Sequence, residues 1–125
     1  MIRLLSSVFL FLAVTSAHAL QIQPYTADKL AQLQAAGKPV SLHFHATWCG
    51  TCIEQEKALL TLKSDPALTA MTLLVVDYDS NKPLRRELKV LSQSVFVVYK
   101  GSKEVAREGG ETSAQKIKNM LSKGL

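Results

Sequence analysis

Two cysteines stand at the junction between two segments with different hydrophobic patterns. Cys49 and Cys52 are the only cysteines of the chain, and their spacing is Cys-x-x-Cys. Residues 40–46 before them form a short apolar run, which is typical of a buried strand, and residues 53–62 after them are amphipathic, which is typical of a helix. The sequence therefore predicts a strand, a tight turn and a helix in succession, with Cys49 at the start of the helix.

This placement favours a reactive pair of thiols. A thiol at a helix N-terminus faces unpaired backbone N–H groups and the positive end of the helix dipole, which stabilise its thiolate. A thiolate attacks a disulfide, and a second thiol two residues further on can resolve the mixed disulfide. The alternative is a structural disulfide, but so short a loop restricts few unfolded conformations and stabilises little. We therefore expect Cys49 and Cys52 to form a redox-active dithiol.

The N-terminal segment has the pattern of a secretory signal peptide. Met1-Ile2-Arg3 carries positive charge, residues 4–14 are apolar apart from two serines, and Ala17-His18-Ala19 fits a small-x-small cleavage site. An uncleaved anchor is the alternative, but the apolar run is shorter than the roughly 20 residues that span a bilayer. We expect residues 1–19 to be a signal peptide and residues 20–125 to form one domain. Export would place the cysteines in an oxidising compartment, the periplasm.

Charge gives little indication of a polyanionic partner. The formal net charge is +5, and lysines, arginines and acidic residues are interleaved along the chain. Because the sequence shows no basic stripe interleaved with aromatic residues, binding of nucleic acid is disfavoured.

The remaining pattern predicts alternating helices and strands. The first two predicted strands enclose a helix and should therefore be parallel, because such crossovers are right-handed. The last two strands flank a turn at Gly101-Ser102 and should form an antiparallel hairpin. The expected order is a helix at 26–36, a strand at 40–46, a helix at 49–62, a strand at 71–77, a helix at 82–89, strands at 95–99 and 104–107, and a helix that begins after Thr112 or Ser113.

This order, together with Ala46-Thr47-Trp48-Cys49-Gly50-Thr51-Cys52, resembles the thioredoxin family. The resemblance covers nearly all of residues 20–125 and implies an α/β domain of thioredoxin-like fold, with a central mixed β-sheet flanked by helices. It implies that Cys49 is an exposed nucleophile and that Cys52 is a buried resolving thiol. We expect Trp48 to shield the dithiol, Gly50 to allow the tight turn, and Thr51 to tune the acidity of the thiols.

The sequence departs from the family pattern at two positions near the dithiol. Ser94 stands where the family usually has a cis-proline, and we expect a trans Gln93–Ser94 bond because a cis bond before a non-proline residue costs about 2.5–4 kcal/mol. The Ser94 hydroxyl either donates to the Cys49 thiolate or belongs to a plain turn residue. His43 replaces the family's buried acid, and it either relays a proton for Cys52 or is satisfied by hydrogen bonds in the core.

A metal site is the second functional alternative. His43 and His45 are two residues apart and should share one face of their strand. Two imidazoles and the two thiolates could together bind zinc or copper. The alternative is that His45 only fills space, as the aromatic residue does at that position in the family. No metal is assigned as a resident cofactor of the redox centre.

The function expected from the resemblance is thiol–disulfide exchange with cysteine-containing exported proteins, without a cofactor. Gly50-Thr51 lacks the histidine of strongly oxidising relatives, and residues 54–57 and 64–66 resemble a reductase-side periplasmic branch. We therefore expect a monomeric reductant that a membrane thiol-electron transporter re-reduces. A third alternative is a non-catalytic thioredoxin-like binding module with structural cysteines.

Overall fold

The computed structural model describes residues 19–125. The predicted signal peptide, residues 1–19, lies outside the described residues except for Ala19. The elements follow in the order β1 (Gln21–Pro24), α1 (Ala27–Ala35), β2 (Pro39–His45), α2 (Gly50–Leu62), the short 3₁₀ helix η1 (Pro66–Leu68), β3 (Thr72–Asp77), α3 (Lys82–Leu88), β4 (Val95–Lys100), β5 (Lys103–Gly109) and α4 (Ala114–Ser122).

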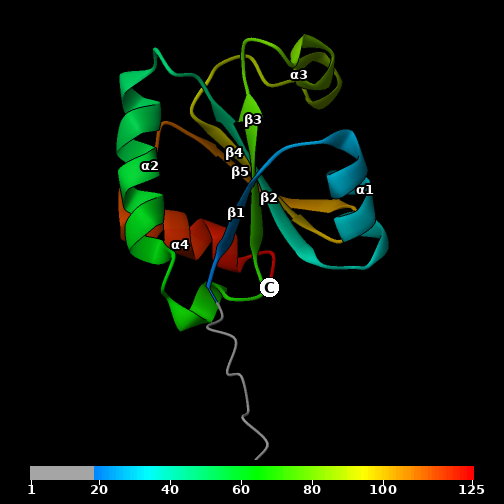
Figure 1. The fold of residues 1–125 in the computed structure, drawn as a ribbon, viewed down its shortest axis with the longest axis vertical. Coiled ribbons are helices and arrows are strands. Elements are labelled where there is room, and N and C mark those ends of the chain that lie inside the picture. Colours follow the sequence, from blue (N-terminus) through cyan, green and yellow to red (C-terminus); the bar gives the residue numbers. More distant parts are fainter. Residues whose placement is uncertain (1–18) are drawn as a thin grey trace, which may run out of the picture.

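The strands form one mixed sheet in the order β1-β3-β2-β4-β5. β2 pairs in parallel with β3 and antiparallel with β4, and β5 completes an antiparallel hairpin with β4. Helices α2 and α4 cover one face of the sheet, and α1 and α3 lie on the other (Figure 1). The predicted fold class, the parallel first pair and the hairpin are confirmed.

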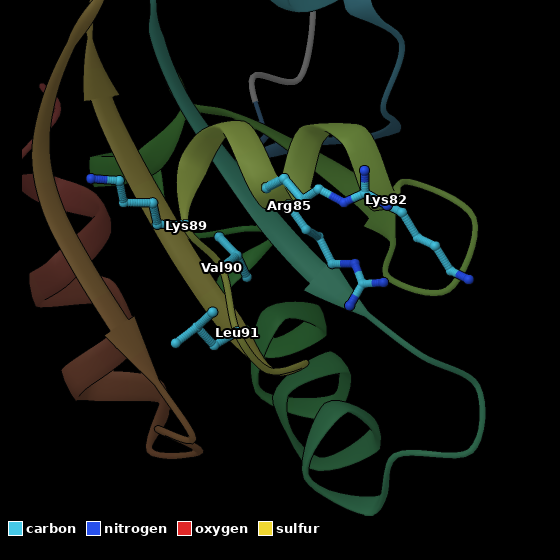
Figure 2. Close-up of a pocket in the computed structure, with 6 residues that line it drawn as sticks. Lys82, Arg85, Lys89, Val90 and Leu91 are labelled. Atoms are coloured by element: carbon cyan, nitrogen blue, oxygen red, sulfur yellow. The ribbon is translucent and has the colours of Figure 1, made fainter.

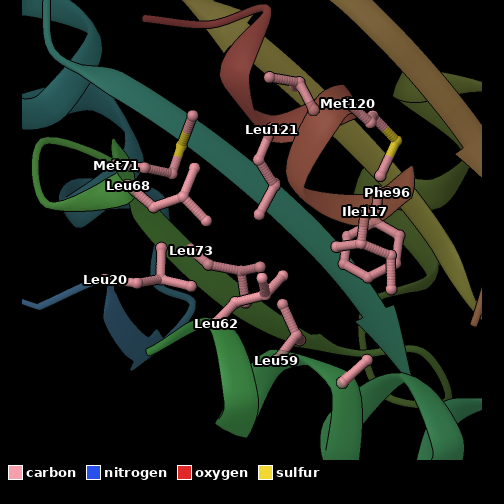
Figure 3. Packing of buried hydrophobic residues seen from close by; sticks show 12 residues of the cluster. Leu20, Leu59, Leu62, Leu68, Met71, Leu73, Phe96, Ile117, Met120 and Leu121 are labelled. Carbon is pink, nitrogen blue, oxygen red and sulfur yellow. The ribbon is translucent and has the colours of Figure 1, made fainter. Parts of the chain in front are cut away.

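Each face of the sheet has its own apolar core because side chains alternate along a strand. Phe96 and Val98 of β4 pack with α2 and α4, whereas Val97 and Tyr99 face α1 and α3. Figure 3 shows the first of these cores, in which Leu59, Ile117 and other side chains from both helices meet the sheet. Each fully buried side chain of this size contributes roughly 1.5–3 kcal/mol to stability.

Strand β1 is absent from the sequence prediction, which begins with a helix. It has only four residues, two of them glutamines, so its apolar pattern is weak. It lies at the edge of the sheet and pairs only with β3, where Pro24 is tolerated. Leu20, just before it, is fully buried and its N–H donates to the Lys63 carbonyl at 3.0 Å. Tertiary contacts, rather than local propensity, therefore create this strand.

Helices α1, α2 and α4 begin at side-chain caps, whereas α3 has no such hydrogen bond at its N-cap residue, Asn81. Thr26 Oγ1 accepts from the Lys29 N–H at 3.1 Å before α1, and Ser113 Oγ accepts from the Lys116 N–H at 3.5 Å before α4. The corresponding cap of α2 is Cys49. Within residues 19–125, no helix combines the length and apolar character that crossing a membrane requires.

Candidate active site

The two thiols lie where β2 ends and α2 begins. Cys49 has an extended backbone (φ −92°, ψ 111°), and its Sγ accepts a hydrogen bond from the Cys52 N–H at 3.1 Å. This bond satisfies one of the N–H groups that a helix leaves without an intrahelical partner in its first turn. Both cysteines are free thiols in the structure. The motif therefore places a sulfur atom at the positive end of α2.

Both thiols are more enclosed than expected for an exposed nucleophile. Cys49 is 4% exposed and Cys52 is 0% exposed, and the two pack with Ala46 and Tyr78. The expectation of an exposed Cys49 is therefore wrong for this structure. The reason is the cap geometry, which turns Sγ towards the helix rather than towards solvent.

The surroundings of Cys52 favour its protonated form. Burial, followed by its interaction with Cys49, raises the pKa of the Cys52 thiol from 9.0 to about 11. Its Sγ lies 4.0 Å from the Phe44 carbonyl oxygen, to which it can donate. At neutral pH Cys52 is therefore a thiol rather than a thiolate, which makes Cys49 the candidate nucleophile.

Trp48 is anchored beside the dithiol rather than packed over it. Trp48 is 61% exposed, and its indole Nε1 donates a hydrogen bond to Asp79 Oδ2 at 2.7 Å. Asp79 follows β3, and its N–H donates to Asp77 Oδ1 at 3.3 Å, which is the turn role expected of these residues. The sequence gives no signal that Asp79 also holds the indole. This bond fixes one rim of the surface around the dithiol.

The two residues between the cysteines contribute little to the geometry of the site. Gly50 is the first residue of α2, its φ is outside the left-handed region, and a Cβ atom would meet nothing within 4 Å. The turn therefore does not require glycine at this position, contrary to the sequence interpretation. Thr51 is exposed, and within residues 19–125 its hydroxyl makes no hydrogen bond that would connect it to either thiol.

Ser94 lies opposite the dithiol with a left-handed backbone, φ 61°. Residues 19–125 contain no cis peptide bond, so the expected trans Gln93–Ser94 bond is confirmed. The Ser94 N–H donates to the Phe44 carbonyl at 2.7 Å, and the Ser94 carbonyl accepts from the Gly110 N–H at 3.0 Å. Among the described residues, no hydrogen bond joins the Ser94 hydroxyl to Cys49, so the structure does not support the proposed hydrogen bond to the thiolate.

Gln55 is a site residue that the sequence reading did not single out. It is fully buried on α2, and its Nε2 donates to the carbonyls of Ser94 at 2.9 Å and Glu111 at 3.0 Å. Its Oε1 is therefore left to accept from His43 Nε2 at 2.7 Å, which fixes the tautomer of that ring. In the sequence, the only signal for this role is that a polar residue occupies a position of the helix that faces the sheet. Gln55 joins α2 to β2 and to the segments around β4 and β5.

His43 is a satisfied core residue in this structure. It is 1% exposed, and its ring stacks on Phe96 with a centroid distance of 4.3 Å. Burial lowers the pKa of His43 from 6.5 to about 4, so the ring is neutral near pH 7 and is a weak base. Its Nε2 is engaged by Gln55. The proton-relay role predicted for His43 gains no support from this arrangement.

His45 shares a face of β2 with His43, as expected, and the ring centroids are 5.8 Å apart. Its Nε2 lies 3.6 Å from Glu56 Oε2. Within residues 19–125, however, no three His, Cys, Asp or Glu side chains are grouped so that they could hold a metal ion. The structure therefore does not bring the two histidines and the two cysteines together as one ligand set.

A Cys-x-x-Cys dithiol that begins a helix directly after the central strand of a mixed sheet is the arrangement of the thioredoxin-like class of dithiol proteins. The thioredoxin family profile matches residues 21–123. The chain is 33% identical to thioredoxin-1 of Drosophila melanogaster over 97 residues, which cover 77% of this chain and 89% of the fly protein. The chain therefore belongs to the thioredoxin family, whose members are thiol–disulfide oxidoreductases.

Further comparisons agree with membership of the thioredoxin family. The crystal structure of Trxlp from Edwardsiella tarda EIB202 superposes with a TM-score of 0.77 at 33% identity, covering 81% of this chain and 98% of that chain. Chloroplastic thioredoxin X of Arabidopsis thaliana is 35% identical over 83 residues, which cover 64% of this chain. The matched region spans 45% of the length of that chloroplastic relative.

Replacing Ser94 with proline should destabilise the fold. Proline fixes φ near −65°, which conflicts with φ 61°, and it removes the N–H that donates to the Phe44 carbonyl. We expect Ser94→Pro to lower the free energy of unfolding by about 2–4 kcal/mol, measured by urea denaturation. The control Ser94→Gly retains the N–H and should stay within about 1 kcal/mol of wild type. Equal stability of Ser94→Pro and wild type would contradict the described backbone.

His43 should make stability depend on pH. The pKa of His43 is about 4 in the fold against 6.5 as a reference, so between these values the unfolded chain binds more protons. The free energy of unfolding should therefore fall as pH drops from 6.5 to 4. We expect His43→Gln to show a shallower slope of the free energy of unfolding over this range in chemical denaturation. Identical slopes for His43→Gln and wild type would be inconsistent with a buried neutral His43.

Proposed function

We propose that the protein is an exported thiol–disulfide oxidoreductase that reduces disulfides of exported proteins through Cys49 and Cys52. One observation carries this proposal: Cys49 Sγ caps α2 while the pKa of Cys52 is raised to about 11. The two thiols are therefore chemically distinct, as a nucleophile and a resolving group must be.

The reaction has two exchange steps. The Cys49 thiolate attacks one sulfur of the substrate disulfide, the substrate S–S bond breaks, and a substrate thiolate leaves. Cys52 then loses its proton and attacks Cys49 Sγ in the mixed disulfide, which expels the second substrate thiolate. Two electrons pass to the substrate, and the protein is left with a Cys49–Cys52 disulfide. The substrate thiolate expelled in the first step is a base that can take up the Cys52 proton.

The sequence supports both export of the protein and a reducing rather than an oxidising role. Residues 1–19 have the signal-peptide pattern, which favours a periplasmic location, and Gly50-Thr51 lacks the histidine of oxidising relatives. A reductant in an oxidising compartment needs a continuing source of electrons, so we assign re-reduction to a membrane thiol-electron transporter. We propose that the domain acts as a monomer. Metal binding is the weaker alternative, because the two histidines and two cysteines are not grouped within residues 19–125.

The reduction potential tests whether the protein acts as a reductant or as an oxidant. We expect residues 20–125 to equilibrate with glutathione or dithiothreitol near the thioredoxin value of about −270 mV, with fluorescence of Trp48, the only tryptophan, as the readout. A value near about −120 mV, that of a strong periplasmic oxidant, would contradict a reducing role. Such a value would leave the exchange chemistry itself intact.

Trapping tests the chemistry. Cys52→Ser leaves Cys49 able to attack but unable to be resolved, so we expect it to accumulate mixed disulfides with substrate proteins on non-reducing gels. The matched variant Cys49→Ser keeps only the buried thiol with the raised pKa and should accumulate few. Absence of mixed disulfides with both variants would instead indicate a binding module with structural cysteines.

A further inference from the structure

Helix α3 carries a group of unpaired positive charges. Four basic residues fall within the eight positions that make up the helix and its C-cap, and Glu87 is the only acidic residue in this stretch. The four are Lys82, Arg85, Arg86 and Lys89. The ion pairs of residues 19–125 involve other cations, so none of these four lies within 4.0 Å of a carboxylate. Along the sequence, cations and acidic residues are interleaved, whereas the helix brings these four basic residues to one face. We call these four side chains the α3 basic face.

The basic face lines a surface cleft. The cleft has a volume of about 490 Å³, and its other lining residues are Val90 and Leu91. Figure 2 shows these side chains projecting from α3 and from the segment that follows it. Leu91 is 91% exposed, so the cleft offers an apolar contact beside the charges. A surface of this kind fits a polypeptide segment that has both carboxylates and apolar groups.

Tyr78 connects the basic face to the dithiol. Its ring packs against the cluster of Ala46, Cys49 and Cys52. The guanidinium carbon of Arg85 lies 3.8 Å from the centroid of the same ring, and the Tyr78 hydroxyl donates to the Leu91 carbonyl at 3.2 Å. The cleft therefore borders the redox centre through one shared side chain.

Arg85 is held in place without a counter-ion. Its position over the Tyr78 ring is a cation–π contact, and its buried Nε has no hydrogen-bond partner within residues 19–125. The positive charge near the dithiol is thus fixed by an aromatic ring and remains uncompensated. Such a charge attracts an approaching anionic group more strongly than one already paired with a carboxylate.

We propose that the α3 basic face selects substrates whose reactive disulfide is flanked by acidic residues. This inference rests on the proposed function. Lys82 and Lys89 are two helical turns apart, about 10 Å along the axis, which matches about three residues of an extended chain. Several carboxylates along one short segment therefore fit the face, with an apolar residue against Leu91. The attraction acts mainly on the rate of encounter and weakens with salt.

The test uses pre-reduced protein in single turnover with two synthetic disulfide peptides. The peptides lack tryptophan and differ only in three glutamates or three glutamines beside the disulfide, and Trp48 fluorescence follows the reaction. We expect the acidic peptide to react about three- to ten-fold faster at low ionic strength. In 0.5 M salt, and in Lys82→Gln/Arg86→Gln at low salt, this ratio should fall towards one. Arg85 is left unchanged because it packs on Tyr78.

The matched control is Lys38→Gln/Lys103→Gln. Both lysines are exposed and lie at the end of the sheet where β2 begins. Their replacement removes the same net charge as Lys82→Gln/Arg86→Gln does. This variant should retain the wild-type ratio. A wild-type ratio of one, or equal ratios in the two double variants, would overturn the inference while leaving the exchange reaction in place. If wild type reduces neither peptide, the proposed function fails as well.

A membrane is the competing partner for such a face. Wild type and Lys82→Gln/Arg86→Gln are therefore also compared for sedimentation with vesicles of phosphatidylglycerol and phosphatidylcholine. Binding that only the wild type shows, combined with a peptide ratio of one, would assign the face to anionic lipid and overturn the substrate proposal. Equal sedimentation of both proteins, combined with a peptide ratio above one that falls in the variant, supports it.

Discussion

The hydrogen bond from the Cys52 N–H to Cys49 Sγ is the contact on which the rest of the site depends. It is a helix cap made by a thiol, so the same atom both begins α2 and is the nucleophile of the proposed exchange. It also places Cys52 one turn into the helix, where burial raises its pKa. The different chemistry of two identical side chains therefore follows from where one helix starts. Gln55 holds the same helix against the sheet through its hydrogen bonds with His43 and the Ser94 carbonyl.

Much of the fold was predictable because its signals are local. The apolar run before the dithiol, the Thr26 cap and the turn at Gly101-Ser102 are each encoded in a few neighbouring residues, and the structure has β2, α1 and the β4–β5 hairpin at these places. The mixed sheet follows from the order of elements and the handedness of crossovers. Strand β1 was missed because its existence depends on pairing with β3, which is distant in sequence.

The parts of the site that sequence could not predict all depend on contacts between distant segments. Gln55 meets His43 and two backbone carbonyls only because α2 crosses the sheet, and Asp79 meets Trp48 only because β3 ends beside β2. The burial of Cys49 depends on Tyr78 as well as on the cap geometry, and Tyr78 lies just after the end of β3. Residue type and spacing predict which sulfur atoms react, whereas the groups that surround these atoms required the three-dimensional arrangement.

The backbone of Ser94 has a consequence for recognition. Its N–H is used by Phe44, and its carbonyl accepts from both Gly110 and Gln55, so both polar groups are already satisfied within the fold. A polypeptide that docks by adding a strand needs free backbone donors and acceptors on its host. Ser94 has neither to offer. At Ser94 itself, discrimination between partners therefore falls to side chains, which vary from one substrate to another, and not to the peptide backbone that all substrates share.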